Sequence, residues 1–263
     1  MSVAGADPLD LTGRVAIVTG GGTGIGAATA RLLAEHGADL VIASRTEAEL
    51  EQVAMSIRDA TGRRCVVVPT DVKQEADIVR LVERTMEEFG QIDILVNNAG
   101  GTRLGPLEQL PTRGWDSIFE LNVRGPFLCT REAGRHMIER GSGAIVNVSS
   151  GAGVTGVKGG AHYSAAKSGL QMFTRVTAAE WGRYGIRCNC VAVGLVGSER
   201  AVAAWEVANL DHERMAANVP LGRAGKPVEV AWPILFLASD AASYVSGQTF
   251  SVDGGPALGG DAD

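Results

Sequence analysis

The sequence lacks the features of several protein classes. No uninterrupted apolar run approaches the roughly 18 residues that a membrane-spanning helix needs. The net charge is −6, and Lys and Arg form no long block of the kind that binds nucleic acid. The first residues show neither the basic nor the apolar segment of a signal peptide. We therefore expect a cytoplasmic protein with no nucleic-acid or membrane partner.

Cysteine and histidine are both scarce, with 4 residues of each in 263. Cys188 and Cys190 lie two apart in a strand-like run and share one face of that strand. No further potential ligand clusters with them, so the sequence predicts no metal site. We interpret all four cysteines as buried thiols in a reducing cytosol.

Apolar runs of strand length alternate with amphipathic runs of helix length along the chain. The predicted strands are Arg14–Thr19, Asp39–Ala43, Arg64–Val68, Ile92–Val96, Ala144–Val148, Arg187–Val193 and Thr249–Val252. The predicted helices lie near 25–37, 46–60, 74–89, 112–140, 161–183 and 227–238. This alternation predicts an α/β fold, a Rossmann-like, doubly wound, seven-stranded parallel sheet with helices on both faces.

No linker-like composition divides the chain, which favours a single domain. We assign that domain to residues 12–255, after an N-terminal extension at 1–11 and before a flexible tail at 256–263. Residues 195–218 are predicted to form a lid over the substrate.

A tyrosine and a lysine carry the strongest indication of chemistry. Tyr163 and Lys167 occupy positions i and i+4, which project from the same face of a helix. The pKa of tyrosine is ordinarily near 10, and acting as a base near neutral pH needs a shift of roughly 3 units, or about 4 kcal/mol. One cation at about 4 Å, at an effective dielectric constant of about 20, supplies that much. The sequence thus predicts that Lys167 lowers the pKa of Tyr163 and prepares it for proton exchange with an alcohol or ketone.

A glycine-rich turn follows the first predicted strand and opens the first predicted helix. Its spacing is Gly20-x-x-x-Gly24-x-Gly26, which allows the backbone to approach a pyrophosphate at the helix N-terminus. The order of strand, turn and helix is the one that a dinucleotide site requires. The predicted cofactor contacts of this turn are Gly20, Gly22, Thr23, Gly24, Ile25 and Gly26.

With this turn, several motifs in the right order resemble the short-chain dehydrogenase/reductase family, in its single-domain branch. Asp71-Val72 follows the third predicted strand, Asn97-Asn98-Ala99-Gly100 follows the fourth, and Asp253-Gly254-Gly255 lies near the C-terminus. The resemblance covers residues 12–255. It implies an oxidoreductase that acts on CH–OH and C=O groups with an NAD(P)(H) cofactor.

The resemblance also implies roles for individual residues. The catalytic tetrad would be Asn122, Ser150, Tyr163 and Lys167, and the family's spacing selects Ser150 over Ser149 to bond the substrate oxygen. Further cofactor contacts would come from Asp71, Val72, Asn98, Ala99, Gly100, Tyr163, Lys167, Gly194, Val196 and Ser198. The chain departs from the family at Val193-Gly194, where Pro-Gly is usual, so we expect a looser wall beside the nicotinamide.

Asn122 lies inside a long helical pattern, and Pro126 follows one helical turn later. Proline has no N–H to bond the Asn122 carbonyl. In the resembled family this carbonyl holds a water that continues a proton relay from the lysine to solvent. We expect Pro126 to strengthen this opening.

The end of the second predicted strand indicates which dinucleotide binds. A carboxylate about 20 residues after the glycines would bond a free ribose. The sequence has Ser44 at that position, followed by Arg45, whose fork of donors matches a phosphate. We predict a preference for NADP(H). Thr23 argues in the other direction, since many NADP-preferring relatives carry a second basic residue there, and NAD(H) stays an alternative.

The substrate is predicted to be a hydrophobic secondary alcohol or ketone, because the lid is apolar and the glycines of 151–160 leave room. Gly100-Gly101 and Gly114-Trp115 are similar to fatty-acyl-thioester reductases of the family, so a 3-oxoacyl or enoyl thioester is a second candidate. Arg103 is either an exposed arginine or a site for a carboxylate or an acyl-carrier phosphate.

Two other functions use related features. A nucleotide-sugar epimerase or dehydratase has a similar tyrosine and lysine, but it typically has a different glycine loop and a further substrate domain. A non-catalytic NADPH-sensing regulator would be expected to lose the serine, tyrosine or lysine that this chain keeps.

Relatives are commonly tetramers, so we expect a homo-oligomer, either a tetramer or a dimer.

Overall fold

A parallel sheet forms the centre of the molecule in the computed structural model, which describes residues 7–207 and 211–256. Its strands are β1 (Val15–Thr19), β2 (Asp39–Ser44), β3 (Cys65–Pro69), β4 (Ile94–Asn97), β5 (Gly143–Ser150), β6 (Ile186–Val193) and β7 (Thr249–Val252). They are arranged in the order β3-β2-β1-β4-β5-β6-β7, and every neighbouring pair is parallel. The prediction of a seven-stranded, doubly wound sheet is confirmed for these residues.

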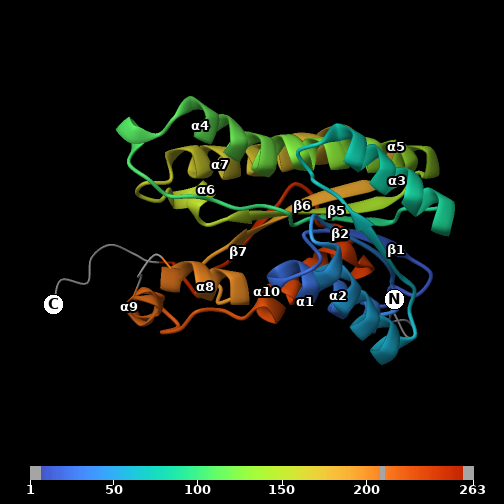
Figure 1. The fold of residues 1–263 in the computed structure, drawn as a ribbon. Coiled ribbons are helices and arrows are strands. Elements are labelled where there is room, and N and C mark those ends of the chain that lie inside the picture. Colours follow the sequence, from blue (N-terminus) through green and yellow to red (C-terminus); the bar gives the residue numbers. More distant parts are fainter. Residues whose placement is uncertain (1–6, 208–210, 257–263) are drawn as a thin grey trace.

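Helices cover both faces of the sheet (Figure 1). One layer contains α1 (Gly24–Glu35), α2 (Glu47–Thr61) and α10 (Pro227–Ala238). The other contains α3 (Glu75–Phe89), α4 (Thr112–Phe119), α5 (Gly125–Arg140) and α7 (Ala161–Trp181). One apolar cluster lies beneath each layer, which explains why the central strands are apolar on both sides.

The segment predicted to form a lid lies between β6 and α10. It contains α8 (Glu199–Val207) and α9 (His212–Ala217), which lie at the carboxyl-end side of the strands (Figure 1). The remaining short helix, α6 (Ala152–Thr155), follows β5 directly.

The single helix predicted at 112–140 is wrong in detail, because a π-helical turn at Glu120–Arg124 separates α4 from α5. In this turn the N–H of Gly125 bonds to the carbonyl of Glu120, five residues earlier. Pro126 stands in the first turn of α5, where its missing N–H is tolerated. The regular helical ladder is thus interrupted at Asn122, where the sequence predicts an opening. The water relay itself stays a prediction.

Residues just before the predicted boundary at residue 12 also contact the sheet and its helices. Leu11 is fully buried in the core, and the N–H of Ala241 donates to the Pro8 carbonyl at 3.1 Å. The part of the N-terminal extension at 1–6 and all of the tail prediction except Pro256 lie outside the described residues.

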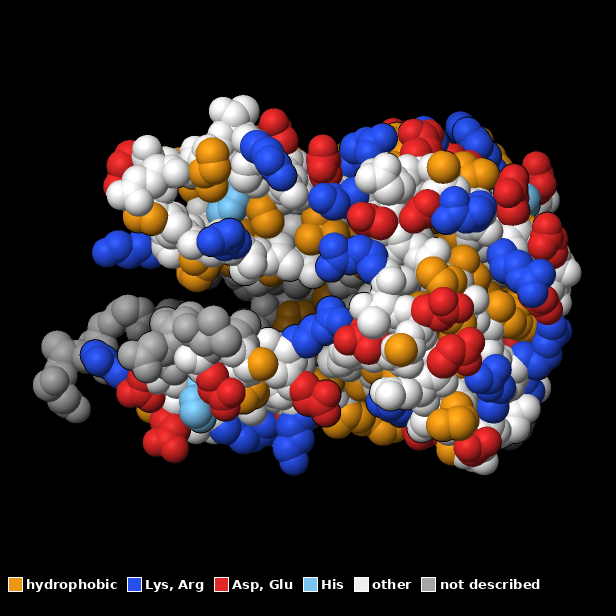
Figure 2. All heavy atoms as spheres, viewed as in Figure 1, with side chains coloured by type: hydrophobic (Ala, Val, Ile, Leu, Met, Phe, Trp, Pro, Cys, Tyr) orange, Lys and Arg blue, Asp and Glu red, His pale blue; other side chains and the backbone are white. Residues whose placement is uncertain are grey.

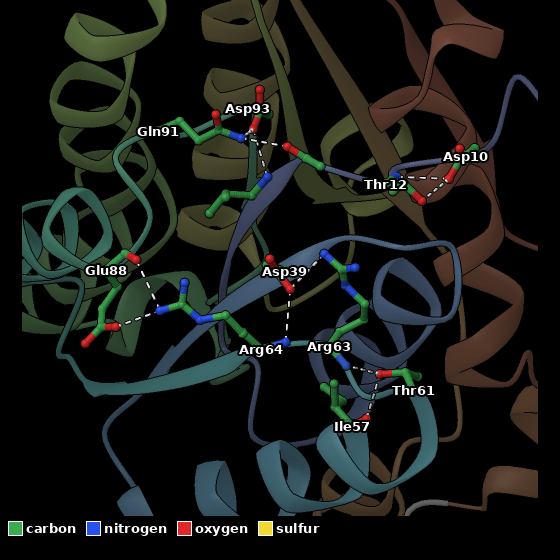
Figure 3. A network of polar contacts seen from close by, with 12 residues as sticks. Asp10, Thr12, Asp39, Ile57, Thr61, Arg63, Arg64, Glu88, Gln91 and Asp93 are labelled. Carbon is green, nitrogen blue, oxygen red and sulfur yellow. Dashed lines mark hydrogen bonds and ion pairs between the residues drawn. The ribbon is translucent and has the colours of Figure 1, made fainter.

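Polar contacts tie together the amino ends of the strands (Figure 3). Asp39, at the start of β2, accepts from the backbone of Arg64 at 2.9 Å and pairs with Arg63 at 2.9 Å. Asp93, before β4, accepts from the N–H of Val15 at 2.8 Å. These bonds fix the amino ends of the strands, and the site lies at the opposite, carboxyl ends.

All four cysteines are free and buried, as predicted. Burial raises the pKa of Cys65 and of Cys129 to about 12, so both thiols stay protonated. In the described part of the chain, no group of three or more Cys, His, Asp or Glu residues is placed to bind a metal. None of the helices described is long and apolar enough to span a membrane.

Candidate active site

A cleft of about 870 Å³ opens at the carboxyl ends of the strands. It appears as a hollow between the layer of α4 and α7 and the layer of α8 (Figure 2). The strand order reverses between β1 and β4, and this reversal is where ligands bind in doubly wound sheets.

Most of the residues predicted for the site lie in the wall of this cleft. They are Gly20, Thr23, Gly24, Ile25, Ser44, Arg45, Asp71, Val72, Asn98, Ala99, Gly100, Ser150, Tyr163, Lys167, Gly194, Val196 and Ser198. Three predicted residues, Gly22, Gly26 and Asn122, do not belong to the wall that the described residues form.

The glycine turn is tightly folded onto the end of β4. Gly20 has a φ of 68°, and a Cβ there would lie 2.7 Å from the Asn98 amide nitrogen. That nitrogen donates to the Thr19 carbonyl at 2.9 Å. A Cβ on Gly26 would overlap the Gly20 carbonyl, so Gly26 allows α1 to pack against the turn and does not itself face the cleft. This geometry fits a pyrophosphate at the N-terminus of α1.

The part of the cleft next to the end of β2, away from the glycine turn's contact with β4, is polar. The Ser44 hydroxyl is buried and has no hydrogen-bond partner among the described residues. Arg45 is exposed at the rim beside it. Gly22 faces this end, since a Cβ on it would lie 3.3 Å from the Ser44 oxygen. A dinucleotide ribose would give the Ser44 hydroxyl a partner.

Lys167 lies deep beneath Tyr163. Its side chain is only 4% exposed, its Nζ donates to the Val148 carbonyl at 2.9 Å, and Nζ is 5.7 Å from the centre of the Tyr163 ring. Burial lowers the pKa of Lys167 to about 8. The ammonium is therefore bound to a backbone carbonyl and lies against the ring of the tyrosine.

The pKa of Tyr163 is raised from its ordinary value, mainly because burial destabilises the phenolate, while a hydrogen bond with Ser150 acts in the opposite direction. The sequence predicts that Lys167, together with an oxidised nicotinamide, lowers this pKa; among the described residues burial outweighs any such effect and the pKa is raised. The sequence places both residues on one face but does not show how much water the site excludes.

The two adjacent serines have different environments. The Ser149 hydroxyl donates to the Lys167 carbonyl at 3.0 Å and accepts from the Gln171 amide at 3.1 Å. Both partners lie on α7, so Ser149 binds this helix to the end of β5. The Ser150 hydroxyl donates to the Val193 carbonyl at 3.3 Å, lines the cleft and reaches Tyr163. This geometry supports Ser150 as the serine that faces a substrate.

Asn122 is fully buried behind Gly100. Its amide nitrogen donates to the carbonyls of Gly101 at 2.9 Å and Ile118 at 3.0 Å. A Cβ on Gly100 would lie 2.9 Å from the Asn122 amide oxygen and 3.2 Å from Nζ of Lys167. Asn122 thus lies near the lysine but does not itself belong to the wall of the cleft that the described residues form.

Comparisons with known proteins agree with this site. A protein-family model described as enoyl-(acyl carrier protein) reductase matches residues 20–256. The chain is 46% identical over 243 residues to a cis-4-hydroxycyclohexanecarboxylate dehydrogenase of Sinomonas cyclohexanicum, covering 92% of this chain and 96% of that one. It is 39% identical over 246 residues to a 3-oxoacyl-[acyl-carrier-protein] reductase of Synechocystis, covering 93% and 97%.

A solved structure of a short-chain type dehydrogenase/reductase from Mycobacterium marinum matches with a TM-score of 0.88 and 32% identity, covering 95% of this chain and 97% of that one. Levodione reductase matches with a TM-score of 0.89 and 34% identity, covering 93% and 97%. The chain belongs to the short-chain dehydrogenase/reductase family.

Val193 of this dehydrogenase/reductase chain stands where the family usually has proline. Backbone hydrogen bonds restrain the chain at this position. The Val193 carbonyl accepts from the N–H of Gly151 at 2.9 Å, and the N–H of Gly194 donates to the Val252 carbonyl at 3.0 Å. A Cβ on Gly194 would lie 2.5 Å from the Cα of Asp253, so glycine is required at the turn. These bonds restrain the backbone that a proline ring would otherwise fix.

The cleft of this family member also contains residues that the sequence did not indicate, among them Lys73, Ser117 and Arg200. Arg200, on α8, pairs with Glu49 of α2, 151 positions away in the chain. No local pattern links residues so far apart, and only the folded structure reveals the contact.

Proposed function

We propose that the protein transfers a hydride between NADP(H) and a hydrophobic secondary alcohol or ketone, with Tyr163 as the general acid or base. The observation that carries this proposal is the convergence of Tyr163, Ser150 and Lys167 in one cleft with the glycine turn. The same convergence disfavours a non-catalytic regulator, which has no need of it.

The chain's own residues have distinct roles in this proposal. When bound, the nicotinamide supplies or accepts the hydride. In reduction, the Tyr163 phenol donates its proton to the substrate oxygen, and its raised pKa keeps that proton in place at neutral pH. Ser150 donates a hydrogen bond to the same oxygen. In oxidation, Tyr163 must first lose its proton, which the buried cation of Lys167 and a positively charged nicotinamide would both favour.

The preference for NADP(H) is supported by the polar end of the cleft. Arg45 is exposed there and can approach a 2′-phosphate with two parallel donors. Neither Ser44 nor Arg45 offers the carboxylate that would bind a free ribose at this position. NAD(H) is the alternative cofactor.

The substrate end of the cleft is partly apolar, with Leu121, Leu195 and Trp205 in its wall. A cyclic secondary alcohol is our first candidate, supported by the dehydrogenase relative that acts on cis-4-hydroxycyclohexanecarboxylate. A 3-oxoacyl thioester is the second candidate, supported by the reductase relative.

The test is a panel of cyclic ketones, cyclic alcohols and acyl thioesters, followed by the absorbance of NADPH. We expect substrate-dependent NADPH oxidation with a ketone or an oxoacyl thioester, and the reverse reaction with the matching alcohol. The Ser150→Ala variant should lose most of this rate, whereas Ser142→Ala, far from the cleft, should not. The absence of turnover across the whole panel would overturn the proposed reaction.

We also propose a cytoplasmic homo-oligomer, a tetramer or a dimer. Its support is the exposure of large apolar residues along α5 and α7, where Phe127 is 40%, Met172 56% and Val176 47% exposed. Light scattering after size-exclusion chromatography would give the mass, and a monomer would contradict this assignment.

A further inference from the structure

The lid contacts the nucleotide half of the cleft through one ion pair. Nη2 of Arg200, on α8, donates to both carboxylate oxygens of Glu49, on α2, at 2.7 and 2.6 Å. Ser198, just before α8, lies beside the glycine turn, 3.2 Å from where a Cβ on Gly24 would be. The base of the lid therefore spans from the pyrophosphate turn to α2.

The ion pair stands where a 2′-phosphate would be recognised. A Cβ on Gly22 would lie 3.5 Å from a carboxylate oxygen of Glu49 and 3.3 Å from the unpartnered Ser44 hydroxyl. Arg200 and Arg45 both line the cleft. In Figure 2, basic and acidic side chains meet at the inner end of the hollow. The position after the second strand is the one that distinguishes a ribose from its 2′-phosphate.

This ion pair can exchange its partner. The side chains of Arg200 and Glu49 are 60% and 32% exposed, and exposed pairs of this kind are weak. Glu49 engages only Nη2, and within residues 7–207 and 211–256 no other group bonds to the guanidinium. The remaining donors of Arg200 are therefore available, and a phosphate dianion is a stronger acceptor for that fork than an exposed carboxylate.

We propose that Arg200 is a second cation for the 2′-phosphate of the cofactor, delivered by the lid, and that Glu49 holds it until the phosphate replaces the carboxylate. This inference rests on the proposed preference for NADP(H). It explains how the chain manages with Thr23 in the glycine turn, where many NADP-preferring relatives have a basic residue. It also couples recognition of the 2′-phosphate to the position of the lid.

The test measures binding of two nucleotide fragments to the full-length protein by titration calorimetry. 2′,5′-ADP carries the 2′-phosphate and 5′-AMP does not, and neither has a nicotinamide, so no turnover is involved. Arg200→Gln should weaken 2′,5′-ADP about tenfold, the loss of one charge-assisted bond, and change 5′-AMP by less than about twofold. Arg214→Gln, an exposed arginine on α9 of the same lid, is the matched control and should change neither.

Glu49→Gln provides an independent arm. It removes the competing carboxylate and should tighten 2′,5′-ADP by about threefold without changing 5′-AMP. An equal loss of affinity for both fragments in Arg200→Gln, or weaker 2′,5′-ADP binding in Glu49→Gln, would overturn the inference. The ion pair would then have a structural role only.

The outcomes separate this inference from the proposed function. If wild-type protein does not prefer 2′,5′-ADP to 5′-AMP, both the NADP(H) preference and the role of Arg200 fail. If the preference exists but only Arg45→Ala removes it, the preference stands and the role of Arg200 fails. A failed substrate panel would leave the fragment result unaffected.

Discussion

Replacing Lys167 by methionine tests whether a buried cation lies against Tyr163. Methionine keeps a similar length and volume but does not titrate. The pKa of Lys167 falls from 10.5 to about 8 in the folded protein, because the side chain is only 4% exposed. Burial of this charge therefore costs the folded protein about 3 kcal/mol at neutral pH.

The sign of the pH dependence follows from the lowered pKa. Between about pH 8 and the ordinary lysine pKa near 10.5, the unfolded chain binds more protons at this site than the folded protein does. As the pH rises through this window, Lys167 loses its proton and the wild type no longer bears the cost of burying that charge. The Lys167→Met variant has no charge at this position, so its stability does not change for this reason. We expect the free energy of unfolding of the wild type to rise by about 2–3 kcal/mol relative to that of the variant from about pH 7 to about pH 10.

The assay is urea unfolding followed by circular dichroism, at a fixed protein concentration because an oligomer's apparent stability depends on it. Groups that do not interact with Lys167, such as Cys65 and Cys129, cancel in the difference. Cys190 does interact with Lys167, but its pKa of about 11 keeps that thiol protonated in the folded protein over this pH range. The Val148 carbonyl loses its donor in the variant at every pH, so this loss shifts the difference without changing its slope. A difference that stays constant across the pH range would refute the buried charge.

Three further predictions concern the cleft. Arg45→Ala should weaken NADPH binding about tenfold and NADH binding little in a fluorescence titration, and equal losses would refute the 2′-phosphate role. Ultraviolet titration, with Tyr163→Phe as the reference, should show the Tyr163 phenol keeping its proton up to at least the ordinary tyrosine range near pH 10, because its pKa is raised; ionisation at lower pH would contradict this. Gly26→Ala should weaken NADPH binding and lower the melting temperature, because a Cβ there overlaps the Gly20 carbonyl, whereas Gly182→Ala, with open space around it, should do neither. A stable, fully binding Gly26→Ala protein would show that close packing of the turn is not needed.

Much of the fold is predictable because local patterns determine it. The strands are apolar runs buried on both faces, and the turn after β1 needs glycine at Gly20, where φ is positive. An opening at Asn122 was expected from Pro126, but the π-helical turn at Glu120–Arg124 that separates two helices was not, since these residues continue a helical pattern and only their packing selects the wider turn.

Most of the predicted site residues line the cleft, but the electrostatics of the cleft could not be predicted. The spacing of Tyr163 and Lys167 brings them to one face, but the depth of burial determines both pKa shifts, and burial depends on the whole cleft. Contacts such as the ion pair of Arg200 with Glu49 join α8 to α2, which is distant in the chain, and no local sequence pattern indicates them.

The central claim is that the Tyr163 phenol exchanges the proton while the hydride moves, and Tyr163→Phe tests it most directly. NADPH affinity and the rate of substrate-dependent NADPH oxidation are measured on the same preparation, with Tyr184→Phe as the control because Tyr184 lies outside the cleft and bonds to Arg183. We predict that Tyr163→Phe binds NADPH within about twofold of the wild type but loses at least about a hundredfold in turnover, and that Tyr184→Phe loses neither. Turnover by Tyr163→Phe at a rate near that of the wild type would contradict the account.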